Sequence, residues 1–256
     1  MNDALAAGAA HVGDWVGGAG TSKTAGNVAA RLRRRMAKGR GWPPLYECSV
    51  RGWCPKRRCE QPMKCHVLLP HEVVDKLCFF GDMDVIMGQS GFDAVTARHV
   101  RNASAQLGET PLGVGLWQDG VPCYWDRSIS CEILSLFLPG LDREHRNFRC
   151  PLAALLNTHV GPNTFHDIFE VMRWSLALMA RKEWPDRRHD GGEWLKSDSY
   201  RKQKSATQPR YPTSAILAQL KGDWKMWKEV MKLPGWNDSQ GCCFMCFIKP
   251  DEASTW

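Results

Sequence analysis

The sequence predicts a mixed α/β protein, an α+β arrangement in which a mixed sheet of short strands packs against helices. Apolar residues alternate with glycine from 112 to 116, a spacing typical of a strand. From 164 to 184 apolar residues recur at steps of three and four, which predicts a long helix. A hydrophobic content of 43% and a charged content of 24% are ordinary for a globular protein. A buried sheet covered by helices accounts for all three observations.

The organised core is predicted to cover residues 111–256. Gly120 is expected to end its first strand, Pro139 its second, and Pro185 its long helix. The short turns between the first three apolar runs favour antiparallel neighbours. The predicted elements are strands at 112–119, 131–138 and 147–155, a helix at 164–184, a strand at 216–220 and a helix at 224–233.

The residues before this core are predicted to form two further regions. Residues 1–40 are expected to be a disordered tail that is rich in Gly and Ala and then basic. Residues 41–110 are expected to be a cysteine-rich basic region followed by a short helix after Pro70 and a polar connector with a weak helical pattern. No stretch of the sequence approaches the ~20 apolar residues of a membrane span, so we expect no membrane partner.

The net charge of +7 is concentrated in one segment. Between Arg31 and His66 there are eleven Lys and Arg but only two acids, Glu47 and Glu60, so the rest of the chain is close to neutral. Such a basic segment favours an acidic partner, nucleic acid first, although a solvated basic arm is the alternative. Residues 186–212 are a second basic loop with the same two interpretations. The candidate phosphate-contacting residues are Arg33, Arg34, Arg35, Lys56, Arg57 and Arg58.

The eleven cysteines are expected to be free thiols or metal ligands, because the chain opens without a secretory signal. Five potential zinc ligands lie within nineteen residues, and zinc prefers four Cys or His side chains in a tetrahedron. Closely spaced Cys-x-x-Cys pairs are absent from this cluster, so free thiols are the alternative there. The candidate zinc ligands are Cys48, Cys54, Cys59, Cys65 and His66, together with the Cys-x-x-Cys pair Cys243 and Cys246.

Two aspartates, each following an apolar run, are the candidate catalytic residues. Asp119 follows the first predicted strand and Asp223 follows the strand at 216–220. Carboxylates at strand ends are suited to binding divalent metal ions such as Mg²⁺ or Mn²⁺. Each aspartate also has a structural interpretation, because Asp-Gly is a favoured turn pair and Asp is a good helix N-cap. Asp126 and Glu132 are nearby acids that could substitute for Asp119 or assist it, and they rank below it because neither ends the first strand.

The ordered set of motifs resembles the catalytic region of eukaryotic DDE/DDD transposases of the CACTA and KDZ-like groups. The resemblance covers residues 112–246 and is carried by Asp-Gly-Val-Pro at 119–122, Leu-Phe-Leu-Pro-Gly at 136–140, Leu-Lys-Gly-Asp-Trp at 220–224 and the downstream Gly-Trp and Cys-Cys-x-x-Cys. It implies a ribonuclease-H-like core in which the first strand is central and the fourth lies beside it. It also implies that Asp119 and Asp223 bind Mg²⁺ or Mn²⁺ and that Cys243 and Cys246 bind Zn²⁺.

The resemblance implies a nuclear protein that hydrolyses and transfers DNA strands at transposon ends. A third acid should follow the zinc element, but only ten residues follow Cys246. We therefore expect a truncated core whose catalysis is incomplete or lost. The alternative is a non-catalytic, zinc-dependent protein that binds nucleic acid or another partner. DNA is the expected partner in the first hypothesis, and the sequence is compatible with an oligomer.

Overall fold

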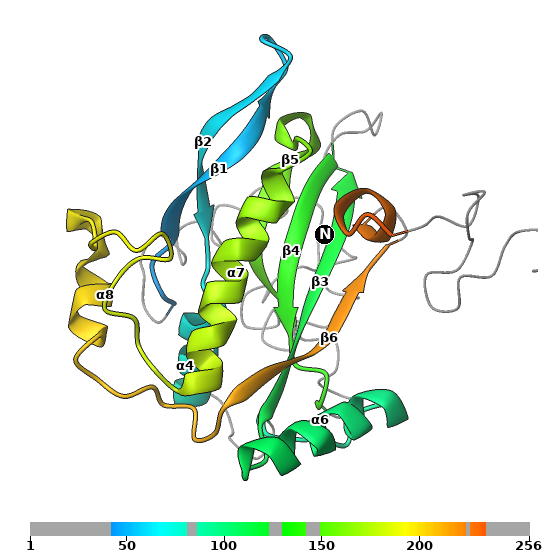
Figure 1. The fold of residues 1–256 in the computed structure, drawn as a ribbon, viewed down its shortest axis with the longest axis vertical. Coiled ribbons are helices and arrows are strands. Elements are labelled where there is room, and N and C mark those ends of the chain that lie inside the picture. Colours follow the sequence, from blue (N-terminus) through cyan, green and yellow to red (C-terminus); the bar gives the residue numbers. More distant parts are fainter. Residues whose placement is uncertain (1–41, 81–85, 123–129, 142–148, 224–225, 234–256) are drawn as a thin grey trace, which may run out of the picture.

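The computed structural model describes residues 42–80, 86–122, 130–141, 149–223 and 226–233, which contain two β-sheets (Figure 1). The smaller sheet is an antiparallel hairpin of β1 (Tyr46–Cys54) and β2 (Cys59–Val67). The larger sheet is mixed and consists of β3 (Leu112–Pro122), β4 (Ser130–Phe137), β5 (Arg149–Leu156) and β6 (Ala215–Gly222). This four-stranded sheet and its helices confirm the predicted mixed α/β class.

Helices pack around the larger sheet. The longest, α7 (Thr164–Arg181), connects β5 to β6 and lies across one face of the sheet (Figure 1). Helix α4 (Pro70–Phe80) packs against α7, and α6 (Ala94–Leu107) contacts β6. The short helical segments are η2 (Asn157–His159), η3 (Lys196–Asp198), α8 (Ser199–Lys204) and η4 (Met226–Val230). Within the described residues, none of the helices combines the length and the apolar character needed to cross a membrane.

The strand order of the larger sheet is β5-β4-β3-β6, which makes β3 an inner strand. Strand β4 is antiparallel to both β3 and β5, whereas β6 is parallel to β3. Antiparallel strands can be joined by short turns, but a parallel neighbour needs a long crossover. Helix α7 lies in that crossover. As a result, β3 and β6 run in the same direction, and their last paired residues are Gln118 and Gly222.

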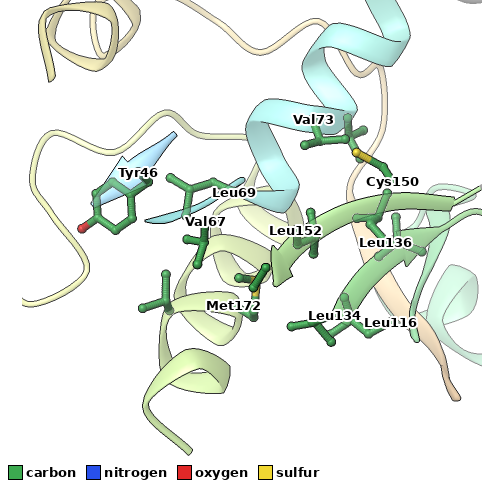
Figure 2. Packing of buried hydrophobic residues seen from close by; sticks show 14 of the residues in the cluster. Tyr46, Val67, Leu69, Val73, Leu116, Leu134, Leu136, Cys150, Leu152 and Met172 are labelled. Carbon is green, nitrogen blue, oxygen red and sulfur yellow. The ribbon is translucent and has the colours of Figure 1, made fainter. Parts of the chain in front are cut away.

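The main core lies between the larger sheet and the layer formed by α7, α4 and the hairpin. Leu116, Leu134 and Leu136 project from β3 and β4 toward Met172 of α7 (Figure 2). Each of these four side chains is at most 2% exposed. Burying a leucine of this kind contributes about 1.5–3 kcal/mol. Because side chains alternate along a strand, the residues between these leucines face the opposite side of the sheet.

The hairpin is attached to the start of α7 by polar contacts. Asp167 of α7 accepts a hydrogen bond from the Arg51 backbone N–H at 2.7 Å and also pairs with the Arg51 guanidinium. The carboxylate of Glu60 accepts hydrogen bonds from the backbone N–H and the side-chain amide of Asn163, both at 2.7 Å. These contacts hold the two strands of the hairpin against one end of the helix.

A buried ionic network joins α4, α8 and the segment that precedes α8. Nη2 of Arg201 donates a hydrogen bond to Glu72 at 2.8 Å, and its Nη1 donates to Asp198 at 2.9 Å. Arg188 pairs with the second oxygen of Asp198 at 3.0 Å. The guanidinium groups of Arg188 and Arg201 also lie 4.8 and 5.0 Å from the ring centre of Tyr46 in the hairpin. Burial raises the pKa of Glu72 to about 7, although Arg201 opposes this shift.

His71 is buried beside this network. Its Nδ1 lies 2.7 Å from the hydroxyl of Ser175 on α7, and its ring makes edge-on contacts with Trp174 and Trp184. Burial, together with the nearby positive charge of Arg201, lowers the pKa of His71 to about 3. The imidazole is therefore neutral in the folded protein over the whole physiological pH range. The sequence predicted a short helix after Pro70, and His71 lies in the first turn of this helix, α4.

Three predicted boundaries differ from the structure. Strand β3 continues past Gly120 to Pro122, so Gly120 does not end it and Asp119 is a strand residue opposite Ile133. Helix α7 ends at Arg181 because Lys182 adopts a left-handed φ of 57° that stops the helix before Pro185. In place of the long helix predicted at 224–233, the described residues contain only the short segment η4.

Two predicted loops contain regular structure. The polar connector at 81–109 includes α6, which is capped by Asp93 at its start and by Gly108, with a left-handed φ of 71°, at its end. The basic loop at 186–212 contains η3 and α8. Arg201 of this loop is a buried ion-pair partner and Arg188 a largely buried one, so they neither track a phosphate backbone nor belong to a solvated insertion. Their burial was not evident from charge patterning alone.

We predict that Arg201→Ala lowers the free energy of unfolding by about 3–5 kcal/mol at pH 8, because it leaves Glu72 and Asp198 buried without their shared partner. The loss should be smaller at pH 5, where Glu72 can take up a proton. Urea unfolding followed by tryptophan fluorescence measures both values. Arg187→Ala, at an exposed position of the same loop, is the control and should change stability by about 0.5 kcal/mol or less. Equal effects of the two substitutions would contradict this account.

We predict that His71 contributes to acid unfolding. A neutral buried histidine contributes stability above its unfolded pKa near 6.5, and this contribution is lost as the pH falls toward the folded value of about 3. Glu72 acts in the opposite sense between about 4.5 and 7. Relative to wild type, His71→Gln should therefore remove a slope of about 1.4 kcal/mol per pH unit between pH 6 and 3. Unfolding titrations across this range measure the slope, and His99→Gln on the exposed face of α6 should leave it unchanged.

Candidate functional site

The two candidate catalytic aspartates lie where the pairing of the parallel strands β3 and β6 ends. Asp119 is on β3, and Asp223 directly follows β6, the parallel neighbour of β3. The last paired residues are Gln118 and Gly222, so one further step along both strands sets Asp119 opposite Asp223. Neighbouring strands are about 4.8 Å apart. The strand register therefore brings Asp119 and Asp223 to neighbouring positions on adjacent strands. A metal ion shared by their carboxylates stays a prediction.

The surroundings of Asp223 also agree with its structural interpretation. Its Oδ1 accepts a hydrogen bond from the backbone N–H of Met226 at 2.7 Å and so caps the segment η4. The cap holds the carboxylate in a fixed orientation and uses one of its two oxygens. Oδ2 is the atom that could bind a metal ion. The cap and a ligand role are therefore compatible in this residue.

Asp119 does not have the turn role that was its structural alternative. It lies within β3, half-buried, on the face of the sheet opposite the leucines that pack on α7. Within the described residues, no hydrogen bond or ion pair occupies its carboxylate; its one charge interaction there is with Arg149. A carboxylate near the end of a paired strand suits the binding of a hard cation such as Mg²⁺.

The nearby acid Glu132 does not join this pair. Glu132 is opposite Gly120 in the sheet, and a Cβ atom at Gly120 would lie 3.4 Å from both carboxylate oxygens of Glu132. Gly120 and Asp119 are consecutive strand residues, so Glu132 lies on the face opposite to Asp119. Asp126 lies outside the described residues. Among the described residues, no group of three or more His, Cys, Asp or Glu is placed to hold a metal ion.

Aromatic and cationic side chains lie beside the aspartates on the same face. Trp117 precedes Asp119 by two residues and is paired across the strands with Lys221, which precedes Asp223 by two residues. The guanidinium of Arg149 lies 3.6 Å from the ring centre of Trp117. Partial burial lowers the pKa of Arg149, and the Asp119 carboxylate opposes this shift. The acid pair is therefore bordered by two positive charges.

The cysteine cluster is organised by the hairpin register. Cys48 is opposite Cys65, and Cys54 is opposite Cys59, six residues further along each strand. Six strand residues span about 20 Å, so one zinc ion cannot bind all four thiols in this hairpin. His66 is exposed beside Glu47, on the opposite side of β2 from the buried Cys65. The structure therefore separates these five residues into two cysteine pairs and a surface histidine.

The two cysteine pairs have different surroundings. Cys48 and Cys65 are buried, and the Cys48 thiol donates a hydrogen bond to the Cys65 carbonyl at 3.6 Å. This pairing and burial raise the pKa of Cys48, which is a thiol at neutral pH. Cys54 and Cys59 lie at the base of the hairpin turn, where Cys59 is exposed. The second predicted zinc pair, Cys243 and Cys246, lies outside the described residues.

Three of the six basic residues predicted to contact nucleic acid are grouped at the turn of the hairpin. Lys56, Arg57 and Arg58 are all exposed, and Figure 1 shows this turn projecting beyond the larger sheet. The remaining candidates, Arg33–Arg35, lie outside the described residues. The exposed turn is a cationic projection of the kind that contacts phosphate groups without reading a sequence.

No family model, curated protein or solved structure matches this chain. The features of the chain that point to a function are therefore the two carboxylates, the strands that carry them and the charges beside them. Sequence reasoning found the two carboxylates but did not identify Trp117, Arg149 and Lys221 as their neighbours. The two-residue spacing from Trp117 to Asp119 and from Lys221 to Asp223 was a usable signal, since alternate strand residues share a face.

We predict that the aspartate pair binds Mn²⁺. The two carboxylates supply hard oxygen ligands, and waters or phosphate oxygens can fill the remaining positions. Isothermal calorimetry should give a site whose affinity falls by about tenfold or more in Asp119→Asn. Asp223→Asn retains the helix cap, so any loss of affinity in this variant reports the ligand role alone. Glu170→Gln, at an exposed acid of α7, is the control; Mn²⁺ binding that is equal in all variants would exclude the site.

Proposed function

We propose that this protein derives from a transposase and that its larger sheet is a ribonuclease-H-like core that acts on DNA with a divalent metal ion. The observation that carries the proposal is the register of the parallel strands β3 and β6, which places Asp119 and Asp223 at neighbouring positions. The order of elements supports it, because an inner first strand with an antiparallel second strand and a parallel fourth strand is the order that such a core requires. The sequence motifs that resemble those of CACTA and KDZ-like transposases are the reason for proposing DNA as the substrate.

The donor set suits Mg²⁺ or Mn²⁺. Both residues are carboxylates, and both ions prefer oxygen ligands and can retain bound water. When bound, such an ion activates a water or a 3′-hydroxyl and stabilises the leaving oxygen of a phosphodiester. Strand pairing fixes the backbone of Asp119, and the hydrogen bond that Asp223 accepts from the Met226 backbone N–H orients the second carboxylate, which reduces the ordering needed when the ion binds.

Two groups of positive charge favour DNA as the partner. The hairpin turn with Lys56, Arg57 and Arg58 is exposed, and Arg149 and Lys221 lie beside the aspartates. Lys and Arg bind DNA by neutralising phosphate charge. The rival proposal, a zinc-dependent binding protein, has less support among the described residues because the hairpin register separates its cysteines.

Two carboxylates without a third acid make a weak metal site for catalysis. Mg²⁺ sites of this kind often use one or two carboxylates and complete the coordination with substrate phosphates. We therefore propose that the metal ion, the aspartates and the DNA phosphate assemble together. On this view metal-dependent DNA binding is the retained property, and strand cleavage is slow.

The test compares wild type with Asp119→Asn on a labelled DNA oligonucleotide, with Mn²⁺ or with EDTA. Mn²⁺ should tighten DNA binding by wild type, measured by fluorescence anisotropy, and should allow slow nicking that is visible on a denaturing gel. Both effects should be lost in Asp119→Asn. Asp190→Asn, which changes an exposed acid in a distant loop, should behave as wild type.

Two outcomes would contradict the proposed function. If Mn²⁺ neither tightens DNA binding nor supports nicking, the aspartates are not a functional metal site. If both effects persist unchanged in Asp119→Asn, they arise elsewhere in the preparation or in the chain. A third outcome would support metal-dependent binding with very slow cleavage. In that case Mn²⁺ tightens DNA binding by wild type but not by Asp119→Asn, and no nicking is visible with either protein.

A further inference from the structure

The face of the sheet that carries the aspartates also carries a row of aromatic and cationic side chains. Gly115, Trp117 and Asp119 alternate along β3 and so project from this face. Gly115 has no side chain, and the ring of Phe137 occupies the space above it, where a Cβ atom would lie 2.3 Å from the ring. Phe137 and Trp117 then meet edge to face, with ring centres 6.4 Å apart. The two rings form a rigid apolar floor next to the acid pair.

Two cations lie over this floor. The Arg149 guanidinium is 3.6 Å from the centre of the Trp117 ring, close enough for stacking. The Lys221 ammonium is 5.0 Å from the centre of the Phe137 ring and 6.0 Å from that of Trp117. Among the described residues, neither Arg149 nor Lys221 forms a salt bridge with a carboxylate. Both cations are therefore in contact with aromatic rings, while carboxylates act on them only at longer range: Asp119 on Arg149 and Asp93 on Lys221.

The surroundings of Arg149 differ from those of three other arginines. Arg51, Arg188 and Arg201 all pair with carboxylates, and the last two are largely buried. A guanidinium centred over an indole makes this contact through its π-system and retains N–H groups that can bind a phosphate in a bidentate manner. Holding the group in place beforehand reduces the ordering cost of binding.

We propose that Trp117, Arg149 and Lys221 form a phosphate subsite for single-stranded DNA beside the metal-binding aspartates. Arg149, supported by Trp117, grips one backbone phosphate through two N–H groups, and Lys221 neutralises the same stretch of backbone. The subsite rests on the proposed function for its DNA substrate, but it needs no metal ion. It positions the strand so that a neighbouring phosphate reaches Asp119 and Asp223. Arg149 and Lys221 are thus positioning residues for the strand.

The test measures binding of a fluorescent single-stranded oligonucleotide in EDTA, where the aspartate pair contributes no metal-dependent affinity. Arg149→Lys keeps the charge but loses the fork and the stacking, and should weaken binding by about tenfold. Trp117→Leu should have a similar effect because it removes the support of the guanidinium. Lys221→Gln should lower the slope of log affinity against log salt by about 0.7, the value for one phosphate contact on a single strand.

Controls separate a specific subsite from general charge attraction. Lys202→Gln removes an exposed positive charge from α8, away from this face, and should bind as wild type. Thermal unfolding should show that Arg149→Lys remains folded, which keeps the test valid even if Trp117→Leu is unstable. Wild-type affinity in Arg149→Lys, or an equal loss in Lys202→Gln, would overturn the subsite. Because these measurements are made in EDTA, that result is distinct from failure of Mn²⁺ to act through Asp119.

Discussion

The parallel pairing of β3 with β6 is the constraint on which the other features of this molecule depend. It requires a crossover, and α7 lies in that crossover and covers one face of the sheet. The leucines of β3 and β4 pack against α7, so the alternate residues of the same strands face the other side. The same pairing makes β3 and β6 run in one direction, so that the two strands end on the same side of the sheet. Asp119 and Asp223 are neighbours because of this topology, although about a hundred residues separate them in sequence.

Buried charge fixes the parts of the chain that strand pairing does not reach. Arg201 and Arg188 connect α8 and its preceding segment to Glu72, to Asp198 and to the ring of Tyr46. Ion pairs of this kind need not add net stability, since desolvation offsets the attraction. Their geometry is demanding, however, so they specify one arrangement of the hairpin, α4 and the loop. The alternative of an apolar contact would hold these segments with less directional control.

How much could be predicted from the sequence depended on the range of the interactions involved. The alternation from 112 to 116 and the apolar periodicity of α7 are local, and both elements were predicted correctly. The cysteine hairpin was not predicted, because Cys48 and Cys65 pair across strands and their spacing alone resembles a metal cluster. The burial of Arg201 was missed for a similar reason, since its partner Glu72 is 129 residues away. Asp119 and Asp223 were found because each follows an apolar run.

The charges on the aspartate face balance one another across the strands. Two carboxylates on adjacent strands repel each other, and such repulsion is relieved by nearby positive charge. Trp117 and Lys221 are direct strand partners, and Arg149 reaches the same indole from β5. Lys221 lies two residues before Asp223, and the Arg149 guanidinium reaches Trp117, two residues before Asp119, a displacement of about 6–7 Å along the strands. A DNA strand with one phosphate held by these cations would therefore bring a neighbouring phosphate to a metal ion bound by the acids. This connects the aromatic rings of the sheet to the chemistry at Asp119 and Asp223.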